Sequence, residues 1–326
     1  MTATVPRPGL ILESDIEQYP EGIILPIDKP YRWTSADVIR KIKWTAGRHF
    51  GKKNLKVGHA GTLDPLATGI LLVCIGKATK LAETLQSHEK EYIAGVSFGA
   101  VTPSFDLEKE IDGIRSLDGV DEDKIRAVLP DFIGEQMQVA PLFSAKSVDG
   151  VRAYETARKL FKQGRMSEAG DLLKASRINI SELELLSCRP YTPSSVDNRL
   201  DMCQPGGINP TPSSVDNQLD MCQSGGINPT PSSLVGTYPA DNKFNSNEKS
   251  CRIHVADISG FELVQTEIRV RCSKGTYIRA LARDLGESVG SGAFLHSLRR
   301  TRVGEFGIED CLSMEDALAV LGHKSL

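Results

Sequence analysis

Asp64 occupies the stretch of this sequence that most constrains how the chain can fold. The surrounding segment 58–69 (GHAGTLDPLATG) contains three glycines and a proline, and Asp64 is the only carboxylate between Asp37 and Glu83. This composition predicts a tight loop rather than a helix or a strand. The next six residues, 70–75 (ILLVCI), have the length and continuous apolar character of a strand buried on both faces.

Two interpretations of Asp64 follow from these residues alone. A single carboxylate on a rigid loop that leads into a buried strand is well placed to act as a fixed nucleophile or base. The same residue is also typical of an aspartate that caps a turn before a proline, here Pro65.

Two segments resemble signatures of one enzyme family. Residues 58–69 resemble the catalytic motif of the TruB family of tRNA pseudouridine synthases, and residues 272–279 (CSKGTYIR) resemble its second signature. The two segments lie far apart in the chain, and they occur in the same order as in the family. In the family, the arginine of the second signature pairs with the catalytic aspartate and its tyrosine lines the pocket. The resemblance therefore implies these roles for Arg279 and Tyr277.

The resemblance also implies a fold and a domain organisation. The expected fold is the mixed α+β pseudouridine synthase fold, with a largely antiparallel central sheet flanked by helices. Residues 1–21 form an N-terminal extension, residues 22–304 the catalytic domain, and residues 305–326 a short tail. This tail is too short for the full C-terminal RNA-binding PUA domain that many relatives carry.

A tandem repeat interrupts the expected catalytic domain. Residues 192–210 recur at 211–229 with two substitutions, and a third copy begins at Thr230. The period of 19 residues matches no helical or β-solenoid repeat, and the segment is rich in Pro, Gly, Ser and Asn. The sequence therefore predicts a disordered insertion at about 190–250.

The implied reaction is the isomerisation of uridine to pseudouridine at position 55, in the T loop of tRNA. The target base leaves its stack, its glycosidic bond is cut, and the uracil is rejoined through C5. Because nothing is oxidised, reduced or added, we expect no metal and no cofactor. Asp64 is the expected anionic catalyst, kept ionised by Arg279. Whether Asp64 attacks the ribose, adds to the uracil or promotes elimination stays open.

Other site residues are carried over from the family by position. Tyr92, on an alternating segment 90–99, matches the tyrosine that stacks on the target base, and it is also a candidate for proton transfer. The remaining expected substrate-binding residues are Lys29, His59, Gly61, Thr62, Tyr277 and Leu298. For Lys29, His59 and Leu298 the respective alternatives are a solvated turn lysine, a structural histidine and a core leucine.

Several elements are expected from local patterns. Thr34 and Ser35 are candidate caps of a helix, and a second helix is expected at 152–161. Residues 138–146 resemble the family's Pro-x-x-Ser-Ala-x-Lys loop. The segment 100–106 departs from the family pattern, which leaves the role of Asp106 open.

The net charge of −3 argues against a nucleic-acid-binding protein, but the charge is unevenly distributed. Residues 38–63 contain seven Lys and Arg residues and no acid, and further basic residues gather at 269–283 and 299–302. These clusters predict a phosphate-binding face. The alternative is that they are scattered solvated side chains.

The expected location is the cytoplasm. The sequence shows no secretory signal and no apolar run of membrane-spanning length, and its seven cysteines, an odd number, fit reduced thiols. We expect tRNA as the partner, a monomer, and no obligatory protein partner.

Three rival functions remain open. The chain could be a tRNA-binding or tRNA-folding protein in which catalysis is secondary or lost, or a guide-RNA-dependent enzyme that modifies ribosomal RNA. A carbohydrate enzyme is a weaker fit, because most glycoside hydrolases need a second placed carboxylate, and none lies near Asp64 in the sequence.

Overall fold

The computed structural model describes residues 3–141, 143, 147–148, 151–152, 175–191 and 253–322. All of them belong to one compact unit, Met1–Asp197 with Ile253–Leu326. The second unit, Asn198–Arg252, lies outside the described residues. So do the repeats at 192–229 and, apart from Arg152, the helix expected at 152–161.

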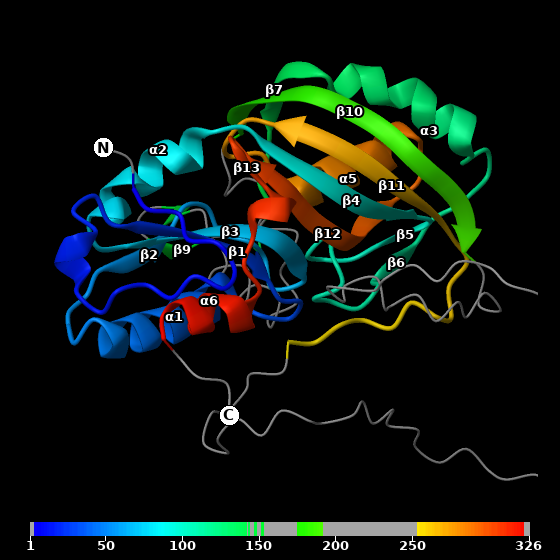
Figure 1. The fold of residues 1–326 in the computed structure, drawn as a ribbon. Coiled ribbons are helices and arrows are strands. Elements are labelled where there is room, and N and C mark those ends of the chain that lie inside the picture. Colours follow the sequence, from blue (N-terminus) through cyan, green and yellow to red (C-terminus); the bar gives the residue numbers. More distant parts are fainter. Residues whose placement is uncertain are drawn as a thin grey trace, which may run out of the picture. The chain divides into compact units, whose positions relative to one another are not determined.

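A nine-stranded sheet organises this unit, with the main order β1-β3-β12-β4-β11-β10-β7 (Figure 1). Strand β2 pairs with β3 and β13 with β12, while β5–β6 and β8–β9 are separate two-stranded pairs. The pairings in the large sheet are antiparallel except β3 with β12, which confirms the largely antiparallel sheet that the family resemblance implied. The strands are β1 Ile23–Lys29, β2 Val57–His59, β3 Ala67–Ile75, β4 Lys90–Phe98, β5 Ala100–Val101, β6 Gly113–Ile114, β7 Gly134–Gln138, β8 Ser147–Val148, β9 Val151–Arg152, β10 Ser176–Tyr191, β11 Leu263–Cys272, β12 Ala293–Val303 and β13 Phe306–Gly307.

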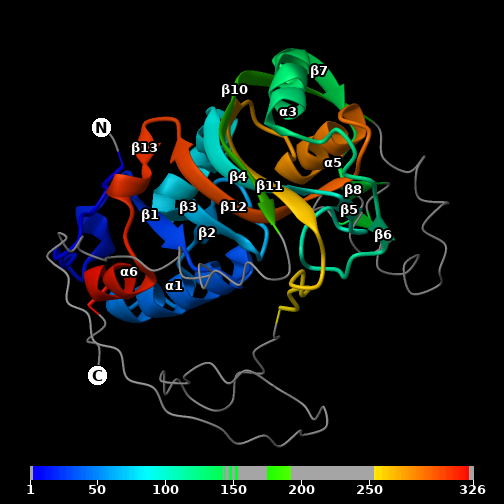
Figure 2. The ribbon, with the colours of Figure 1, turned by 90° about the vertical axis from the view of Figure 1, so that its right-hand side faces the viewer.

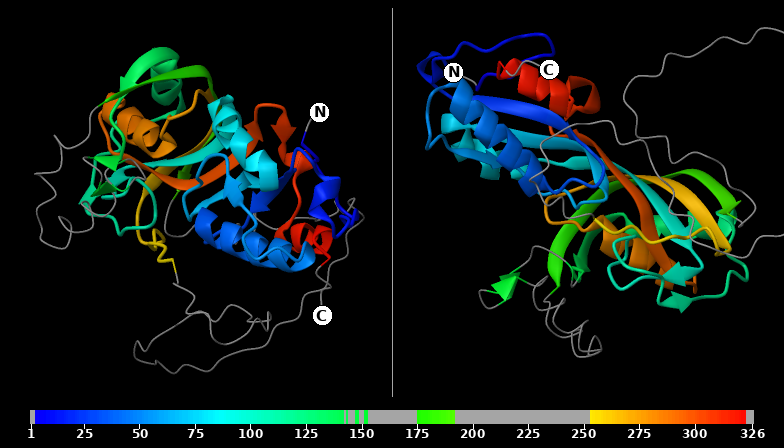
Figure 3. Two further views of the ribbon diagram at one scale, coloured as in Figure 1. Left: turned by 90° about the vertical axis from the view of Figure 1, so that its left-hand side faces the viewer. Right: turned by 90° about the horizontal axis from the view of Figure 1, so that it is seen from below.

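Two groups of helices pack near opposite ends of the sheet. Helices α1 (Ser35–His49) and α6 (Met314–Val320) contact each other and lie against β1 and β2, whereas α3 (Glu122–Val128) and α5 (Ile278–Ser288) accompany β10, β4 and β12 (Figures 2 and 3). A short helix α2 (Ala82–Ser87) precedes β4. The 3-10 turns are η1 Ile16–Gln18, η2 Gly76–Leu81, η3 Leu129–Phe132 and η6 Ile308–Asp310. No helix in the described residues is both long and apolar enough to span a membrane.

Local sequence explains the elements around Asp64. Every residue of β3 is buried, which confirms the prediction of a strand covered on both faces. In β4 the first part alternates, and Tyr92 and Ala94 turn toward the core. Thr34 caps α1 in a capping box with Asp37, so one of the two expected caps is confirmed.

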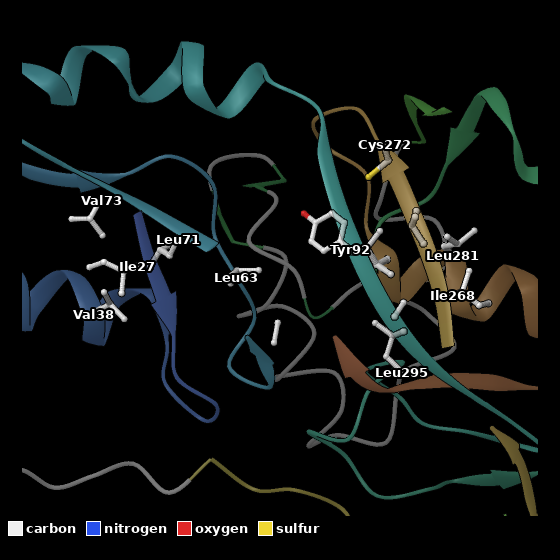
Figure 4. Close-up of a cluster of buried hydrophobic side chains, with 14 of the residues drawn as sticks. Ile27, Val38, Leu63, Leu71, Val73, Tyr92, Ile268, Cys272, Leu281 and Leu295 are labelled. Atoms are coloured by element: carbon white, nitrogen blue, oxygen red, sulfur yellow. The ribbon is translucent and has the colours of Figure 1, made fainter. Parts of the chain in front are cut away.

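The core follows both faces of the sheet, and its largest cluster joins the two groups of helices. Figure 4 shows part of this cluster, with Leu63 from the catalytic-motif loop, Tyr92 from β4 and Leu295 from β12. The segments outside 22–304 also take part in the packing. Leu12 and Ile16 are buried before β1, and Leu312 and Val320 are buried after β12.

Candidate active site

The loop that carries Asp64 is held on both sides of this residue. On one side, the Ser35 hydroxyl donates to the Leu63 carbonyl and accepts from the Leu63 N–H, at 2.9 Å each. On the other side, the Pro65 carbonyl accepts from the Arg32 N–H at 3.0 Å. The Asp64 side chain itself stays 37% exposed. The backbone is therefore fixed while the carboxylate remains accessible.

Lys29 is fully buried and supports this loop by hydrogen bonds. Its ammonium donates to the carbonyls of Pro30, Trp33 and Pro65, at 2.9, 2.6 and 3.3 Å. Burial lowers the pKa of Lys29 to about 8, against an opposing effect of the Asp64 carboxylate. All three donors are used within the protein, so the geometry favours support of the Asp64 loop over direct contact with a substrate.

Arg279 lies in the first turn of α5 and connects two carboxylates. Its Nε atom is 2.9 Å from Asp64 Oδ2, and its Nη1 atom is 3.5 Å from Asp106 Oδ2. The Nε–H group makes no aligned hydrogen bond to a described atom, so the Asp64 contact is an ion pair. Nη1 and Nη2 also donate to the carbonyls of Ser104 and Phe143. Burial alone would lower the pKa of Arg279, but the surrounding carboxylates raise it.

Asp106 and Glu108 add negative charge behind this ion pair. Ser104 donates a hydroxyl hydrogen bond of 2.6 Å to Asp106, and the Glu108 N–H donates another of 2.9 Å. Burial raises the pKa of Asp106 against the effect of Arg279. Burial, and then the Asp106 carboxylate, raise the pKa of Glu108 to about 7. Sequence reasoning left Asp106 open and did not single out Glu108.

A pocket opens beside this cluster. It is lined by Asp64, Leu66, Ala67, Asp106, Arg279 and residues 295–298 of β12, which include Leu298. Leu298 pairs with Ala67 of β3 and with Ala94 of β4. The structure thus brings Asp64, Arg279 and Leu298 to one pocket from three distant parts of the chain.

Tyr92 is buried on β4, with its hydroxyl oxygen on the side that faces Leu63 (Figure 4). Burial raises its pKa, whereas Arg300 lowers it by charge and by a hydrogen bond. The Asp64 carboxylate has a further, smaller effect that raises this pKa.

The other expected site residues lie around the same loop or at the start of α5. His59 ends β2 with a buried Nδ1 atom, and burial and then Arg300 lower its pKa. Gly61 has a positive φ of 98°, and its carbonyl accepts from Arg300. Thr62 is exposed. Tyr277 precedes α5, and its N–H donates to Gln138 Oε1 at 2.8 Å.

Most basic residues at 269–283 and 299–302 are buried or have acidic partners, whereas Lys274 is exposed, and a phosphate-binding face there stays a prediction. Arg269 pairs with Glu184, Arg271 with Glu91 and Glu182, Arg283 with Asp284, and Arg299 with Asp28. Arg300 is buried. Cross-strand neighbours supply most of these acids, and a linear sequence does not show such pairs.

Among the residues that the structure describes, no group of three or more His, Cys, Asp or Glu side chains is arranged to hold a metal ion. Among the charged groups that line the pocket are the Asp64 carboxylate and the Arg279 guanidinium, and Tyr92 lies on the neighbouring strand β4.

Comparisons with known proteins match nearly the whole chain. Residues 48–200 match the model "TruB family pseudouridylate synthase (N terminal domain)", and residues 279–324 match "tRNA pseudouridylate synthase B C-terminal domain". The tRNA pseudouridine synthases B of Phocaeicola vulgatus and Bacteroides thetaiotaomicron are each 40% identical, over 91% of this chain and 92% of theirs.

Among solved structures, a chain in the "Crystal Structure of a Cbf5-Nop10-Gar1 Complex" is 22% identical with a TM-score of 0.49, covering 98% of this chain and 60% of that one. The identity of 40% over more than nine-tenths of both the chain and its curated relatives is the finding that decides the family. The chain belongs to the TruB family of pseudouridylate synthases.

Proposed function

We propose that this chain isomerises uridine to pseudouridine in tRNA, at position 55 of the T loop, with Asp64 as the anionic catalyst. The observation that carries the proposal is the Asp64–Arg279 ion pair at the rim of a pocket. Asp64 is partly exposed there, whereas Arg279 is only 5% exposed. A buried guanidinium that cannot lose its proton holds the carboxylate ionised and oriented toward a nucleotide.

Two side chains at and beside the pocket would contact a base that has left its stack. Leu298 offers an apolar contact beside Asp64, and Tyr92 offers a ring from the neighbouring strand. Stacking of a base on an aromatic side chain stabilises it by about 1–3 kcal/mol, which helps to offset the cost of unstacking. In this proposal Tyr92 also carries a proton during the rearrangement.

The residues around the pocket take the roles of substrate contact and support. Gly61, Thr62 and His59 would meet the nucleotide from the Asp64 loop, and Tyr277 from the start of α5. Lys29 would act through the loop, because its ammonium is already bound to three carbonyls.

Exposed basic residues on α1 and the following loop would contact phosphates of the tRNA. They include Lys43, Arg48 and Lys53, and Arg48 lies over the exposed ring of Trp44 at 4.8 Å. We further propose that the chain works in the cytoplasm as a monomer, without a cofactor or an obligatory protein partner.

The test is the release of tritium from an unmodified tRNA transcript labelled at uridine C5. Rejoining the uracil through C5 displaces the hydrogen on that carbon into water. The purified chain should release tritium in EDTA without any added cofactor, and Asp64→Asn should reduce the rate to background. The exposed Asp118→Asn is the matched control and should keep full activity.

Two results would contradict this proposal. If the wild type binds the transcript but releases no tritium, the result favours a tRNA-binding or tRNA-folding protein, or a guide-RNA-dependent enzyme. If Asp64→Asn retains the wild-type rate, the reaction occurs without Asp64 and the assigned catalyst is wrong.

A further inference from the structure

Arg300 is the bulkiest of the fully buried side chains among the described residues. It lies on β12, opposite Tyr92 of β4 on one side and Gly69 of β3 on the other. No carboxylate in the described part of the chain lies within ion-pair distance of it, although other arginines of β11 and β12 have such partners. A buried cation without an acidic partner is costly, and its contacts show what it holds.

Two of these contacts fix the guanidinium to the catalytic-motif segment. Nε donates to the Ile70 carbonyl at 2.7 Å, and Nη2 donates to the Gly61 carbonyl at 3.2 Å. Gly61 and Ile70 lie on either side of Asp64 in the sequence. The planar fork of donors is thus attached at two points and has little freedom to turn.

Tyr92 is a further neighbour of the guanidinium. Arg300 and Tyr92 are directly opposite each other on β12 and β4, so their side chains lie on one face of the sheet. Arg300 lowers the pKa of Tyr92 by its charge and by a hydrogen bond. A phenol has one hydrogen to donate and two lone pairs that can accept. When a guanidinium N–H occupies one lone pair, the orientation of the O–H group is restricted.

We propose that Arg300 is a positioning residue for the isomerisation: anchored on the carbonyls of Gly61 and Ile70, its guanidinium holds the Tyr92 hydroxyl so that the O–H group is directed toward the nucleotide beside Asp64. This inference rests on the proposed function, since it assigns the supporting residue for a proton carried by Tyr92. A lysine would retain the charge but not the fork, because an ammonium on a flexible stem acts as a point charge.

The experiment combines Arg300→Lys, Tyr92→Phe and the double variant in single-turnover tritium release, with tRNA affinity measured by filter binding. Misplacing a catalytic group by about 1 Å can cost about 100-fold, so Arg300→Lys should slow the single-turnover rate by about 10- to 100-fold. Its tRNA dissociation constant should stay within about threefold of wild type. In the Tyr92→Phe background, Arg300→Lys should add less than about threefold, because the hydroxyl that it positions is already absent.

The adjacent Arg299→Lys is the matched control. Arg299 lies on the same strand as Arg300 but pairs with Asp28 of β1, and its replacement should leave the single-turnover rate near that of the wild type. The positioning role would be overturned if Arg300→Lys reacts at the wild-type rate, if it changes tRNA affinity alone, or if it slows both backgrounds equally. Absence of release by the wild type would instead contradict the proposed function.

A crystal structure of the wild-type chain gives a test that depends neither on variant folding nor on residual activity. It should place an Arg300 nitrogen within about 3.2 Å of the Tyr92 hydroxyl oxygen, the range of a hydrogen bond. A separation beyond about 4 Å would overturn the proposal whatever the kinetics show.

Discussion

The Arg279 side chain has two roles. It orients the partly exposed Asp64 and neutralises the buried Asp106. Removing one partner of a buried charge pair leaves the other uncompensated in a medium that solvates it poorly. Arg279→Met should therefore lower the free energy of unfolding by about 3–5 kcal/mol and abolish isomerisation. Urea denaturation monitored by circular dichroism checks the stability.

The control for this prediction lies one turn further along α5. Arg283 pairs with Asp284 and is more exposed than Arg279, with 20% of its side chain accessible. Arg283→Met should cost about 1 kcal/mol or less, as partly exposed pairs usually do. An equal loss in both variants would show that burial does not make the Arg279 contacts special.

Glu108 makes stability depend on pH in a defined direction. Its pKa is about 7 in the folded chain and 4.5 is the ordinary value, so the folded state keeps the proton that the unfolded state releases. The free energy of unfolding should therefore fall as the pH rises from 4.5 to 7. Glu108→Gln should remove this loss, raising stability at pH 8 by up to about 3 kcal/mol and leaving it nearly unchanged at pH 4.5.

Denaturant unfolding at the two pH values measures this effect, and the exposed Glu305→Gln is the control. The control should change stability by less than about 0.5 kcal/mol at either pH. If Glu108→Gln has the same effect at pH 4.5 and pH 8, the proton is not retained in the folded state.

At the level of elements, the parallel pairing of β3 with β12 depends on one glycine. Gly69 has a φ of 96°, and a Cβ atom there would lie 2.2 Å from the Arg300 carbonyl oxygen and 2.7 Å from its nitrogen. Neither backbone atom can move without breaking the pairing at Arg300. Gly69→Ala should destabilise the chain by at least about 3 kcal/mol, through the clash added to the strain of a positive φ.

Gly134, at the start of β7, separates these two contributions. Its φ is 102°, but a Cβ atom there would have nothing within 4 Å. Gly134→Ala should therefore cost only the conformational strain, about 1–2 kcal/mol. Thermal unfolding measures the loss of stability in both variants. Equal losses would show that the clash with the Arg300 backbone adds nothing to the effect of Gly69→Ala.

How far the sequence predicts an element depends on how local its cause is. The cap of α1 at Thr34, the buried strand after Asp64 and the alternation around Tyr92 depend on near neighbours, and the structure confirms them. Asp106, which contacts Arg279, forms an isolated bridge with Leu295, a residue distant in the chain. No local pattern encodes such a bridge, and only the family resemblance paired Arg279 with Asp64 in advance.

The burial of Arg300 is a second feature that local sequence does not predict. As one of several basic residues at 299–302 it suggested a surface charge, because composition does not distinguish a solvated arginine from one enclosed by β3, β4 and β12. Its position becomes clear only when the register of three strands is known. The site is thus predictable where a motif carries it and unpredictable where strands from different parts of the chain meet.

At the scale of the whole molecule, the unit that contains the site is built from two stretches of chain that meet at β10 and β11. The register places Tyr191 opposite Leu263, so the sheet is continuous across the point where the insertion leaves and returns. The residues just after the insertion belong to the same unit: Ala256 donates its N–H to the Leu107 carbonyl, and the Ile253 carbonyl accepts from Arg32. The segment 198–252 forms the other unit.

This arrangement predicts that the insertion can be removed without loss of activity. Joining Asp197 directly to Ile253 deletes 198–252 but keeps every strand of the sheet and every residue assigned to the pocket. The entropic cost of closing a loop changes slowly with its length, so the melting temperature should stay within about 4 °C of the full chain. Tritium release from tRNA should be unchanged. A shortened chain that folds with the same melting temperature but has lost tRNA affinity would instead show that the repeats take part in binding RNA.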